Sequence, residues 1–328
     1  MKIIPILLIL TLPGFFTCQA QNNKQMSENK NPLLCDPETG VCEIPGNANN
    51  SSTLASTSAG KPVKIIYFTD PICSSCWGIE PQLHKLKLEY GEVIGIEYRM
   101  GGLLPDWSYN SGGISKPSDV AHHWDEVSLH YDMPIDGDVW LEDPLPSSFP
   151  PSIAFKSAQL QDNQKALRFL RRIREMVFLE KKNITKWEHI ADAATAVGLD
   201  AQQLQKDMED KGKKAFEADL ALARQMGVRG FPSMFFTDST GKQEFVYGVK
   251  PYKVYETAIQ KLAASAKPFA YNKDWQHLFN HFNTLTKKEF AELMNISAAE
   301  SNTLLQKLTS EGLLVETSTK NGSLWRVK

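Results

Sequence analysis

The sequence predicts an α/β protein with two parts. One is a mixed sheet-and-helix core with a large helical insertion, and the other is a small α+β unit at the C-terminus. Three observations lead to this fold class. An apolar run at residues 63–68 leads directly into a helix start that carries two cysteines. A long helix-rich stretch separates it from a second strand at residues 230–236, and residues 270–328 combine helical periodicity with a hairpin signal.

Length and composition are those of an ordinary globular protein. The chain has 328 residues, of which 42% are hydrophobic, so it is long enough for two or three domains with a sizeable core. Its formal net charge of −2 gives no general attraction to nucleic acid or to an anionic membrane surface. Composition therefore disfavours nucleic-acid binding and leaves most other classes open.

Residues 1–20 are predicted to be an export signal. Lys2 is followed by a short apolar segment, Ile3 to Phe16, and then by small residues. Two processing routes stay open: cleavage after Ala20, or lipidation of Cys18 as in bacterial lipoproteins. Either route implies an exported protein of the periplasm or cell envelope, and the lipidation route would attach it to a membrane through a lipid anchor at Cys18 alone.

Residues 21–60 are predicted to be a flexible N-terminal segment, because they are rich in Asn, Ser, Thr, Gly and Pro. Cys35 and Cys42 lie within it, separated by the turn-forming residues 36–40. A bridge between them has two interpretations, a local staple or a second redox pair that exchanges electrons with the pair Cys73 and Cys76. Apart from Cys18 the chain has four cysteines, an even number that suits disulfide pairing outside the cytoplasm.

The strongest functional signal is Cys73-Ser74-Ser75-Cys76, which follows the strand at residues 63–68. Its two thiols are one helical turn apart at the start of a helix. Unpaired backbone N–H groups there stabilise a thiolate at Cys73, which makes it a nucleophile. Cys76 is close enough to attack a mixed disulfide formed by Cys73, so the spacing favours thiol–disulfide exchange.

Two other functions of such a motif are less consistent with the chain. A zinc site needs a second ligand pair at similar spacing, and Cys35 and Cys42 have six residues between them and no nearby His-x-x-x-His. A purely structural disulfide between Cys73 and Cys76 closes almost no loop. The motif therefore predicts redox chemistry, with no metal and no other cofactor.

The stretch between this motif and residue 230 is predicted to be mainly helical. Apolar residues recur at three- and four-residue steps from Ser152 to Leu179, a further helix starts near Ile184 and stops at Gly198, and a last helix covers about 201–225.

Two prolines complete a family resemblance. Pro81 lies inside the helix that follows Cys76, where a proline destabilises the helix by about 3 kcal/mol unless the fold uses the kink. Pro232 begins the downstream strand, within Gly230-Phe231-Pro232. With the cysteine motif they resemble the thioredoxin superfamily. The long insertion is similar to the DsbA-type family, and Asp70-Pro71, Gly101-Gly102-Leu103 and Gly230-Phe231-Pro232 are similar to its FrnE and SpxH/YjbH-like branch.

The resemblance covers residues 62–266 and implies a DsbA-like thioredoxin domain at 61–268, with the helical insertion at about 110–225. It implies that Cys73 attacks a substrate sulfur and that Cys76 resolves the mixed disulfide. It also implies a cis bond before Pro232, which shapes a groove for an extended substrate segment.

The chain departs from the family between its cysteines, where Ser74-Ser75 replaces the usual proline or Pro-His. The direction of electron flow is therefore open, because serine hydroxyls stabilise a thiolate more weakly than a charged group does. Glu80 and Glu97 are candidate proton acceptors for Cys76. Three histidines, His84, His122 and His123, could approach the site in the folded protein, but each alone is interpreted as a surface residue.

Residues 270–328 are predicted to form a winged-helix-like unit. A helix around Trp275–Phe282 is followed by capping boxes at Thr286 with Glu289 and at Ser297 with Glu300, and then by a hairpin that turns at Asn321-Gly322. From Thr284 onward the unit has six basic and five acidic residues, a net charge of +1. Such a balance is a poor match to a phosphate backbone, so we interpret the unit as a protein-contact or substrate-docking module.

Together these signals predict an exported protein thiol–disulfide oxidoreductase or isomerase that acts through Cys73, Cys76 and Pro232 on protein thiols and disulfides, with a redox partner protein and no nucleic acid. Two alternatives remain. One is a noncatalytic, redox-sensing adaptor of the SpxH type that uses the thioredoxin fold to bind protein. This role is cytoplasmic, and the export signal counts against it. The other is a winged-helix regulator, which the charge disfavours.

Overall fold

The computed structural model describes residues 35–36, 40–43, 60–108 and 116–328. A four-stranded sheet lies at its centre, in the order β4-β3-β6-β7. Strand β3 (Val63–Thr69) pairs in parallel with β4 (Ile94–Met100) and antiparallel with β6 (Ser233–Asp238), which pairs antiparallel with β7 (Gln243–Tyr247). Strand β3 is almost wholly buried, because it has a paired strand on each edge and both of its faces are covered.

The helix after β3 is interrupted. Helix α1 (Ser74–Gly78) ends at Ile79, and α2 (Glu80–Tyr90) begins directly after it, with Pro81 in its first turn. Proline has no N–H to donate and its ring disfavours the helical conformation of the preceding turn, so the break lies just before Pro81. The sequence predicted one kinked helix here, and the structure has two short ones in line.

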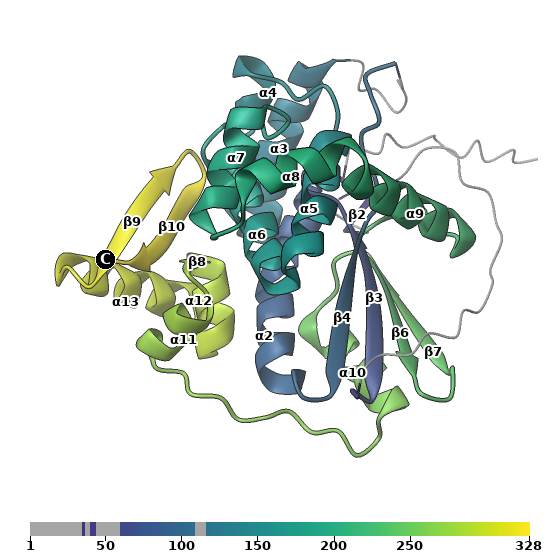
Figure 1. The fold of residues 1–328 in the computed structure, drawn as a ribbon. Helices are drawn as coiled ribbons and strands as arrows, with labels where there is room; N and C mark the ends of the chain where they lie inside the picture. The colour runs from purple at the N-terminus through teal and green to yellow at the C-terminus, as the bar shows by residue number, and fades with distance from the viewer. Residues whose placement is uncertain (1–34, 37–39, 44–59, 109–115) are drawn as a thin grey trace, which may run out of the picture.

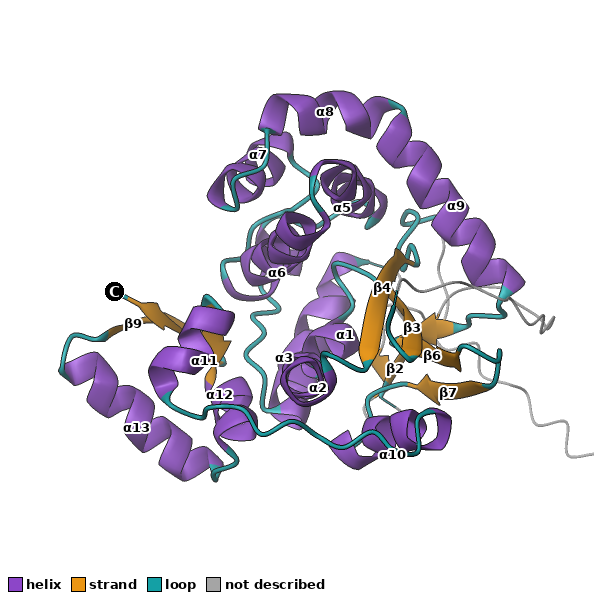
Figure 2. Ribbon diagram, turned by 60° about the horizontal axis from the view of Figure 1, so that its bottom comes forward, coloured by secondary structure: helices purple, strands orange, loops and turns teal. Residues whose placement is uncertain are grey.

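The helices of the insertion lie beside α1, α2 and the edge strand β4, with α9 packed against β4 (Figures 1 and 2). They are α3 (Pro117–Tyr131), α4 (Val139–Glu142), α5 (Phe149–Gln161), α6 (Asn163–Leu179), α7 (Trp187–Ala196), α8 (Ala201–Glu209) and α9 (Lys211–Gln225). The predicted single helix at 201–225 is wrong, because the chain breaks at Asp210 between α8 and α9. The break lets both helices pack on α5, and Gly212 comes so close that an added Cβ would lie 1.9 Å from the Ser157 hydroxyl.

After the insertion the chain returns to the sheet through β5 (Gly230–Phe231), and α10 (Tyr252–Leu262) packs on β6 and β7. Strand β5 belongs to a separate small sheet with β1 (Cys35–Asp36) and β2 (Val41–Glu43), in the order β1-β2-β5. The N-terminal segment that carries Cys35 and Cys42 is therefore paired with the strand that leads into Pro232.

The C-terminal unit has its own core and a three-stranded sheet, β8-β10-β9. Its elements are α11 (Trp275–His281), β8 (Thr284–Thr286), α12 (Lys287–Met294), α13 (Ala298–Ser310), β9 (Leu314–Thr319) and β10 (Gly322–Val327). Both predicted capping boxes, at Thr286 with Glu289 and at Ser297 with Glu300, are present. Helix α12 packs on α2, so the unit lies against the opposite side of α2 from the central sheet (Figure 2).

The thioredoxin fold with an inserted helical domain, predicted from the sequence, is present in this arrangement of sheet and helices. The assignment of the C-terminal unit as a winged helix stays a prediction. Within the part of the chain that the structure describes, each helix is too short or too polar to cross a lipid bilayer.

Candidate functional site

Cys73 and Cys76 lie where β3 gives way to α1. Cys73 is the N-cap of α1, with φ −76° and ψ 106°, and its Sγ accepts a hydrogen bond of 3.1 Å from the backbone N–H of Cys76. Both thiols are free and 0% exposed. The helix start thus offers the N–H group that the sequence predicted for Cys73, but the pair is closed to solvent.

A buried carboxylate, Asp70, shapes the loop that carries the two cysteines. It accepts hydrogen bonds from the backbone N–H of Ile72 at 3.0 Å, the N–H of Leu103 at 2.8 Å and the hydroxyl of Ser148 at 2.8 Å. Burial raises the pKa of Asp70 to about 6, although these hydrogen bonds favour its charged form. Asp70 therefore joins the cysteine loop to the chain after β4 and to the start of α5.

Arg174 of α6 is the cation nearest to this loop and is only 1% exposed. Its guanidinium donates to Thr69 Oγ1 at 2.6 Å, to the carbonyl of Asp70 at 3.3 Å and to Glu80 Oε1 at 2.5 Å. A fully buried arginine requires compensating partners, and these three acceptors supply them.

The two thiols differ in acidity because their surroundings differ. Burial, followed by the hydrogen bond that Cys73 shares with Cys76, raises the pKa of Cys73. Burial also opposes ionisation of Cys76, but that same hydrogen bond and the charge of Arg174 outweigh it and lower the pKa of Cys76. In this closed arrangement the thiolate is favoured at Cys76.

Glu80, a predicted proton acceptor for Cys76, is a member of an ion-pair network. Its Oε1 lies 2.5 Å from Arg174 Nη1 and its Oε2 lies 3.3 Å from His84 Nε2. Burial raises the pKa of Glu80, but the hydrogen bond with His84 and the charge of Arg174 outweigh burial and hold it well below its usual range. A carboxylate whose acid has so low a pKa is a weak base, so Glu80 is a poor proton acceptor for Cys76, and its role is to neutralise Arg174.

The other residues considered as candidates near the cysteines, Glu97 and the histidines, differ in their burial and their partners. Glu97 is on β4, where it pairs with Lys64 at 2.5 Å and with Arg99, and 30% of its side chain is exposed. His122 is on the surface, as predicted, with 83% of its side chain exposed. The prediction of a surface position for His84 is wrong, because it is 5% exposed and stacks on Phe282 with a centroid distance of 4.0 Å.

The Phe231–Pro232 peptide bond is cis, as the family resemblance implied. Phe231 itself is fully buried, and its ring packs over Gly101, where an added Cβ would lie 1.7 Å from the ring. Phe231 pairs in register with Cys42 of β2, while Ser233 on the other side of Pro232 pairs with Phe68 of β3. Pro232 therefore joins the small sheet to the central one.

Cys42 reaches the cysteine pair through this small sheet. Its Sγ lies 3.3 Å from the Sγ of Cys73, and it is disulfide-bonded and 0% exposed. Cys35 lies opposite Cys42 in the register of β1 and β2. The structure thus brings Cys42, Cys73 and Cys76 together, whereas Cys18 and the side chain of Cys35 lie outside the residues that it describes.

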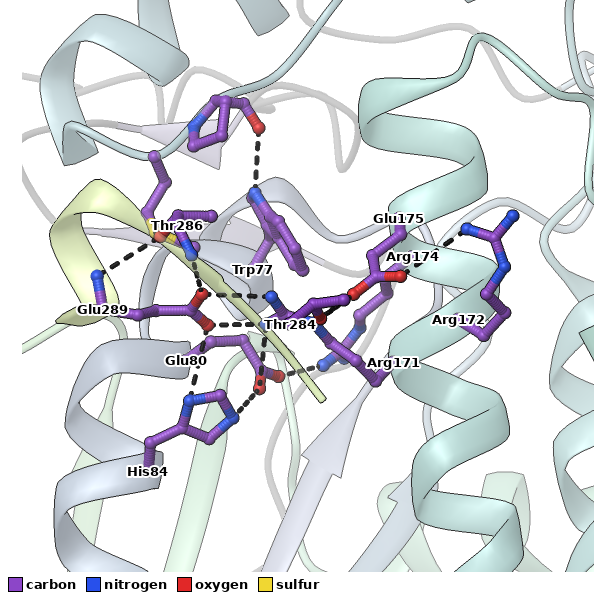
Figure 3. Close-up of polar contacts among 12 residues, drawn as sticks. Trp77, Glu80, His84, Arg171, Arg172, Arg174, Glu175, Thr284, Thr286 and Glu289 are labelled. Atoms are coloured by element: carbon purple, nitrogen blue, oxygen red, sulfur yellow. Dashed lines mark hydrogen bonds and ion pairs between the residues drawn. The ribbon is translucent and has the colours of Figure 1, made fainter. Parts of the chain in front are cut away.

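A second charge cluster links the cysteine motif to the C-terminal unit (Figure 3). Arg171 of α6 makes a bidentate pair with Glu289 of α12, at 2.5 and 3.0 Å, and its guanidinium lies 4.5 Å from the ring centre of Trp77. Glu289 is 0% exposed, and its second oxygen also accepts the backbone N–H of Thr286 at 2.7 Å. The cluster therefore connects α1, α6 and α12.

A metal ion is one alternative occupant of this cluster. Glu80, His84 and Glu289 are all buried and offer ligand atoms that lie within 4.8 Å of one another. Arg174 and Arg171, however, already bind the two carboxylates at 2.5 Å, and so supply the positive charge that an ion would bring. The arrangement is that of an ion-pair network.

Sequence reasoning missed Arg174 and Arg171, whereas the contact between Cys42 and Cys73 agrees with one of its two interpretations of the Cys35–Cys42 pair. A signal for Arg174 was available, since it lies four residues after Leu170 and three before Val177, on the apolar side of a helix. A charged residue at such a position is buried and needs a partner. The signal for Cys42 was the second cysteine pair itself, but the polar, aperiodic residues before β3 gave no indication of where this pair lies in the fold.

Comparisons with known proteins agree with this fold. A family model described as thioredoxin matches residues 67–257. The solved structure of a candidate protein disulfide isomerase from Nitrosomonas europaea is similar with a TM-score of 0.52 and 21% identity, over 62% of this chain and 97% of that one. At this identity the likeness shows the fold alone.

Among curated proteins, the "ClpXP adapter protein SpxH" of Halalkalibacterium halodurans is 33% identical over 307 residues, which cover 92% of this chain and 99% of the relative. The protein of the same name from Bacillus subtilis is 28% identical over 271 residues, or 81% of this chain and 89% of the relative.

These relatives correct the predicted function. The predictions of an exported thiol–disulfide oxidoreductase or isomerase and of a periplasmic or envelope location are wrong, because the relatives that align over most of the chain are named as ClpXP adapters. The comparisons likewise give no support to an export signal or a lipid anchor at Cys18, a residue outside the described part of the chain. The chain belongs to the thioredoxin superfamily, in the DsbA-like, SpxH/YjbH branch.

Proposed function

We propose that this protein is a noncatalytic adapter that binds a client protein through its thioredoxin fold and brings it to ClpXP. The observation that carries the proposal is the extent of the match to the SpxH adapter of Halalkalibacterium halodurans, which spans 92% of this chain and 99% of that relative. An alignment of this extent includes the C-terminal unit as well as the thioredoxin fold, so it supports a shared role for the whole protein.

The state of the cysteine pair supports a noncatalytic role. An exchange enzyme presents a reactive thiolate to its substrates. Here Cys73 and Cys76 are both 0% exposed, burial raises the pKa of Cys73, and β2 covers Cys73 with Cys42 at 3.3 Å. A protein substrate has no access to Cys73 while this hairpin is in place.

The C-terminal unit suits a protein partner better than a nucleic acid. It is held to the thioredoxin fold by the buried pair of Arg171 and Glu289, so both parts present their surfaces in a fixed arrangement. An adapter needs two contact surfaces held in this way, one for the client and one for ClpXP. The near-neutral charge of residues 284–328 argues against phosphate binding.

The test is direct binding of the full chain to ClpXP. Immobilised protein should bind purified ClpXP saturably in biolayer interferometry, and we would measure this both with Cys73 and Cys76 reduced and with the two joined in a disulfide. Binding in at least one of these forms supports the adapter role, and absence of binding in both overturns it.

A second measurement examines the noncatalytic part of the proposal. The same protein preparation should reduce insulin no faster than the added reductant alone, with a thioredoxin as the positive control. Sustained turnover of insulin disulfides at a thioredoxin-like rate would show that the protein is an enzyme and would refute a noncatalytic role.

A further inference from the structure

We propose that the β1–β2 hairpin is an internal reaction partner of the cysteine pair, such that Cys73 exchanges intramolecularly with the disulfide of Cys42. This inference goes beyond the adapter role and does not depend on it. It rests on the way in which the hairpin is bound to β5, on the distance between two sulfur atoms and on the strand register.

The hairpin is bound to the site by specific contacts. Strand β2 pairs antiparallel with β5, with Cys42 opposite Phe231, and the carbonyl of Gly40 accepts the backbone N–H of Val249 at 2.8 Å. Val41 and Cys42 are 2% and 0% exposed. An added strand of this kind gains affinity from its main-chain hydrogen bonds and selectivity from its buried side chains. The hairpin therefore lies beside Pro232, where the sequence analysis expected an extended substrate segment.

The sulfur atoms are close enough to react. Cys73 Sγ lies 3.3 Å from Cys42 Sγ, within the range of about 3–3.5 Å that defines a near-attack arrangement. Cys76 is one turn further along and shares a hydrogen bond with Cys73. Both steps of an exchange, attack by Cys73 and resolution by Cys76, can thus take place without rearrangement of α1.

Cys35 is assigned as the disulfide partner of Cys42. Cys73 and Cys76 are both free, and Cys35 lies directly opposite Cys42 in the register of β1 and β2. Residues that face each other in an antiparallel pair have Cα atoms about 4.5–5.5 Å apart, within the range for a disulfide of about 4.4–6.8 Å.

The exchange is balanced within the molecule. The sulfur of Cys73 loses its proton and attacks the sulfur of Cys42; a Cys73–Cys42 bond forms, the Cys42–Cys35 bond breaks, and the sulfur of Cys35 leaves and takes up a proton. Cys76 then loses its proton and attacks the sulfur of Cys73; a Cys73–Cys76 bond forms, the Cys73–Cys42 bond breaks, and the sulfur of Cys42 leaves and takes up a proton. Two electrons pass from the Cys73–Cys76 pair to the hairpin pair, and no external oxidant or reductant is required.

The test is to trap the mixed disulfide in the full chain. In a Cys76→Ala variant purified with the Cys42 disulfide intact, Cys73 can attack but nothing resolves the product. After quenching with acid and alkylation, peptide mass spectrometry should find a Cys42–Cys73 crosslink, with Cys35 alkylated as a free thiol. The Cys42→Ser/Cys76→Ala variant should give no such crosslink. Absence of the crosslink in Cys76→Ala, or a crosslink from Cys73 to Cys35 instead, overturns the proposal.

Two controls test whether the crosslink forms within one molecule and whether it requires the bound hairpin. The rate of crosslinking should be independent of protein concentration over a tenfold range, and a proportional increase would mean that the reaction is intermolecular. Within the Cys76→Ala background, Gly40→Ala should slow crosslinking about tenfold or more, since even 1 Å of misplacement is costly. Gly40 has φ +69°, and an added Cβ would lie 2.7 Å from Val249 N.

Gly241→Ala is the matched control for Gly40→Ala. Gly241 also has a positive φ, +87°, but an added Cβ there meets nothing within 4 Å. It therefore imposes similar backbone strain without disturbing the hairpin, and its crosslinking rate should equal that of Cys76→Ala alone. Equal slowing by both glycine variants would show that hairpin docking does not set the rate, and would overturn the proposed geometry.

Discussion

Replacing Arg171 by methionine tests whether one buried ion pair holds the C-terminal unit (residues 275–327) on the thioredoxin fold. Arg171 binds Glu289 at 2.5 and 3.0 Å, and Glu289 is 0% exposed. Methionine keeps an apolar stem of similar length over Trp77, so the main loss is the charge. Removal of one member of a buried pair leaves the other charge uncompensated and costs about 3–5 kcal/mol.

His84 and a backbone group limit that loss. The Nδ1 of His84 lies 3.4 Å from Glu289, and the backbone N–H of Thr286 still donates to the carboxylate. We therefore expect the lower end of the range, about 3 kcal/mol, which is about a 10²-fold change in an opening equilibrium. Since unfolding of a protein with two cores need not be two-state, the assay is hydrogen exchange of the α12 amides rather than a single melting temperature.

Arg172→Met is the matched control. Arg172 lies next to Arg171 on α6 but pairs chiefly with Glu180, with a longer contact of 3.5 Å to Glu175, and 26% of its side chain is exposed, so its loss should cost less than about 1 kcal/mol. A Glu289→Gln/Arg171→Met double variant should recover part of the loss, because no unpaired carboxylate remains. If Arg171→Met and Arg172→Met change exchange of the α12 amides equally, the ion pair does not hold the unit in place.

The same pair makes docking sensitive to acid. Burial raises the pKa of Glu289, but the charge of Arg171 outweighs burial and lowers the pKa overall. The pKa of Glu289 is therefore lower in the folded protein than in the unfolded chain, where it is about 4.5. Ionised Glu289 stabilises the folded state at pH values above 4.5, and this stabilisation is lost as the pH falls through the folded-state pKa. Exchange of the α12 amides, corrected for intrinsic rates, should therefore be steady above pH 5 and rise below pH 4.5 in the wild type, with a smaller rise in Arg171→Met.

Three further changes test the cysteine loop. Arg174→Met should raise the pKa of Cys76, because a positive charge is lost, and thiolate absorbance at 240 nm against pH measures this; an unchanged titration would contradict it. Asp70→Asn should remove a pH dependence of the unfolding free energy. Because the pKa of Asp70 is raised from 3.8 to about 6, protonated Asp70 contributes about 3 kcal/mol of stability that is fully present below pH 3.8 and lost by pH 6. Urea unfolding measures this, and an equal change of stability with pH in variant and wild type would refute it. Gly101→Ala should lower stability by about 1–3 kcal/mol through its clash with a buried ring, whereas Gly95→Ala, with only Lys61 Cδ at 3.8 Å, should not, and thermal unfolding compares them.

The elements that sequence alone predicted are those with local signals. The strand at residues 63–68, the helix start at Cys73 and the two capping boxes of the C-terminal unit each depend on residues close together in the chain. The break between α8 and α9 was missed because it follows from packing on α5 and not from a proline or an evident turn sequence.

The functional site was predicted less completely, because its charges come from distant parts of the chain. Glu80 was noticed for its distance from Cys76, yet its role is set by Arg174, which lies 94 residues away. Glu289 was recognised as a capping residue, but its partner Arg171 comes from the insertion. The predicted enzyme function was wrong for a related reason. A cysteine motif indicates which chemistry a fold can perform, but a fold does not by itself determine function, and a relative that aligns over 92% of this chain is named as an adapter.

The two proposals meet at β5. Backbone pairing at this strand involves β2 of the same chain, with Cys42 opposite Phe231, so an extended client segment that binds beside Pro232 has to displace the hairpin. Reduction of the Cys42 disulfide removes the covalent constraint on β1 and β2 and leaves noncovalent contacts to hold the hairpin: the short pairing with β5, the contact of Gly40 with Val249 and the buried side chains of β2. Because internal exchange transfers electrons to the hairpin as it joins Cys73 to Cys76, oxidation of the buried pair and weakening of the hairpin would occur together. Client binding at β5 would then depend on the redox state of the protein, although no client cysteine takes part in the reaction.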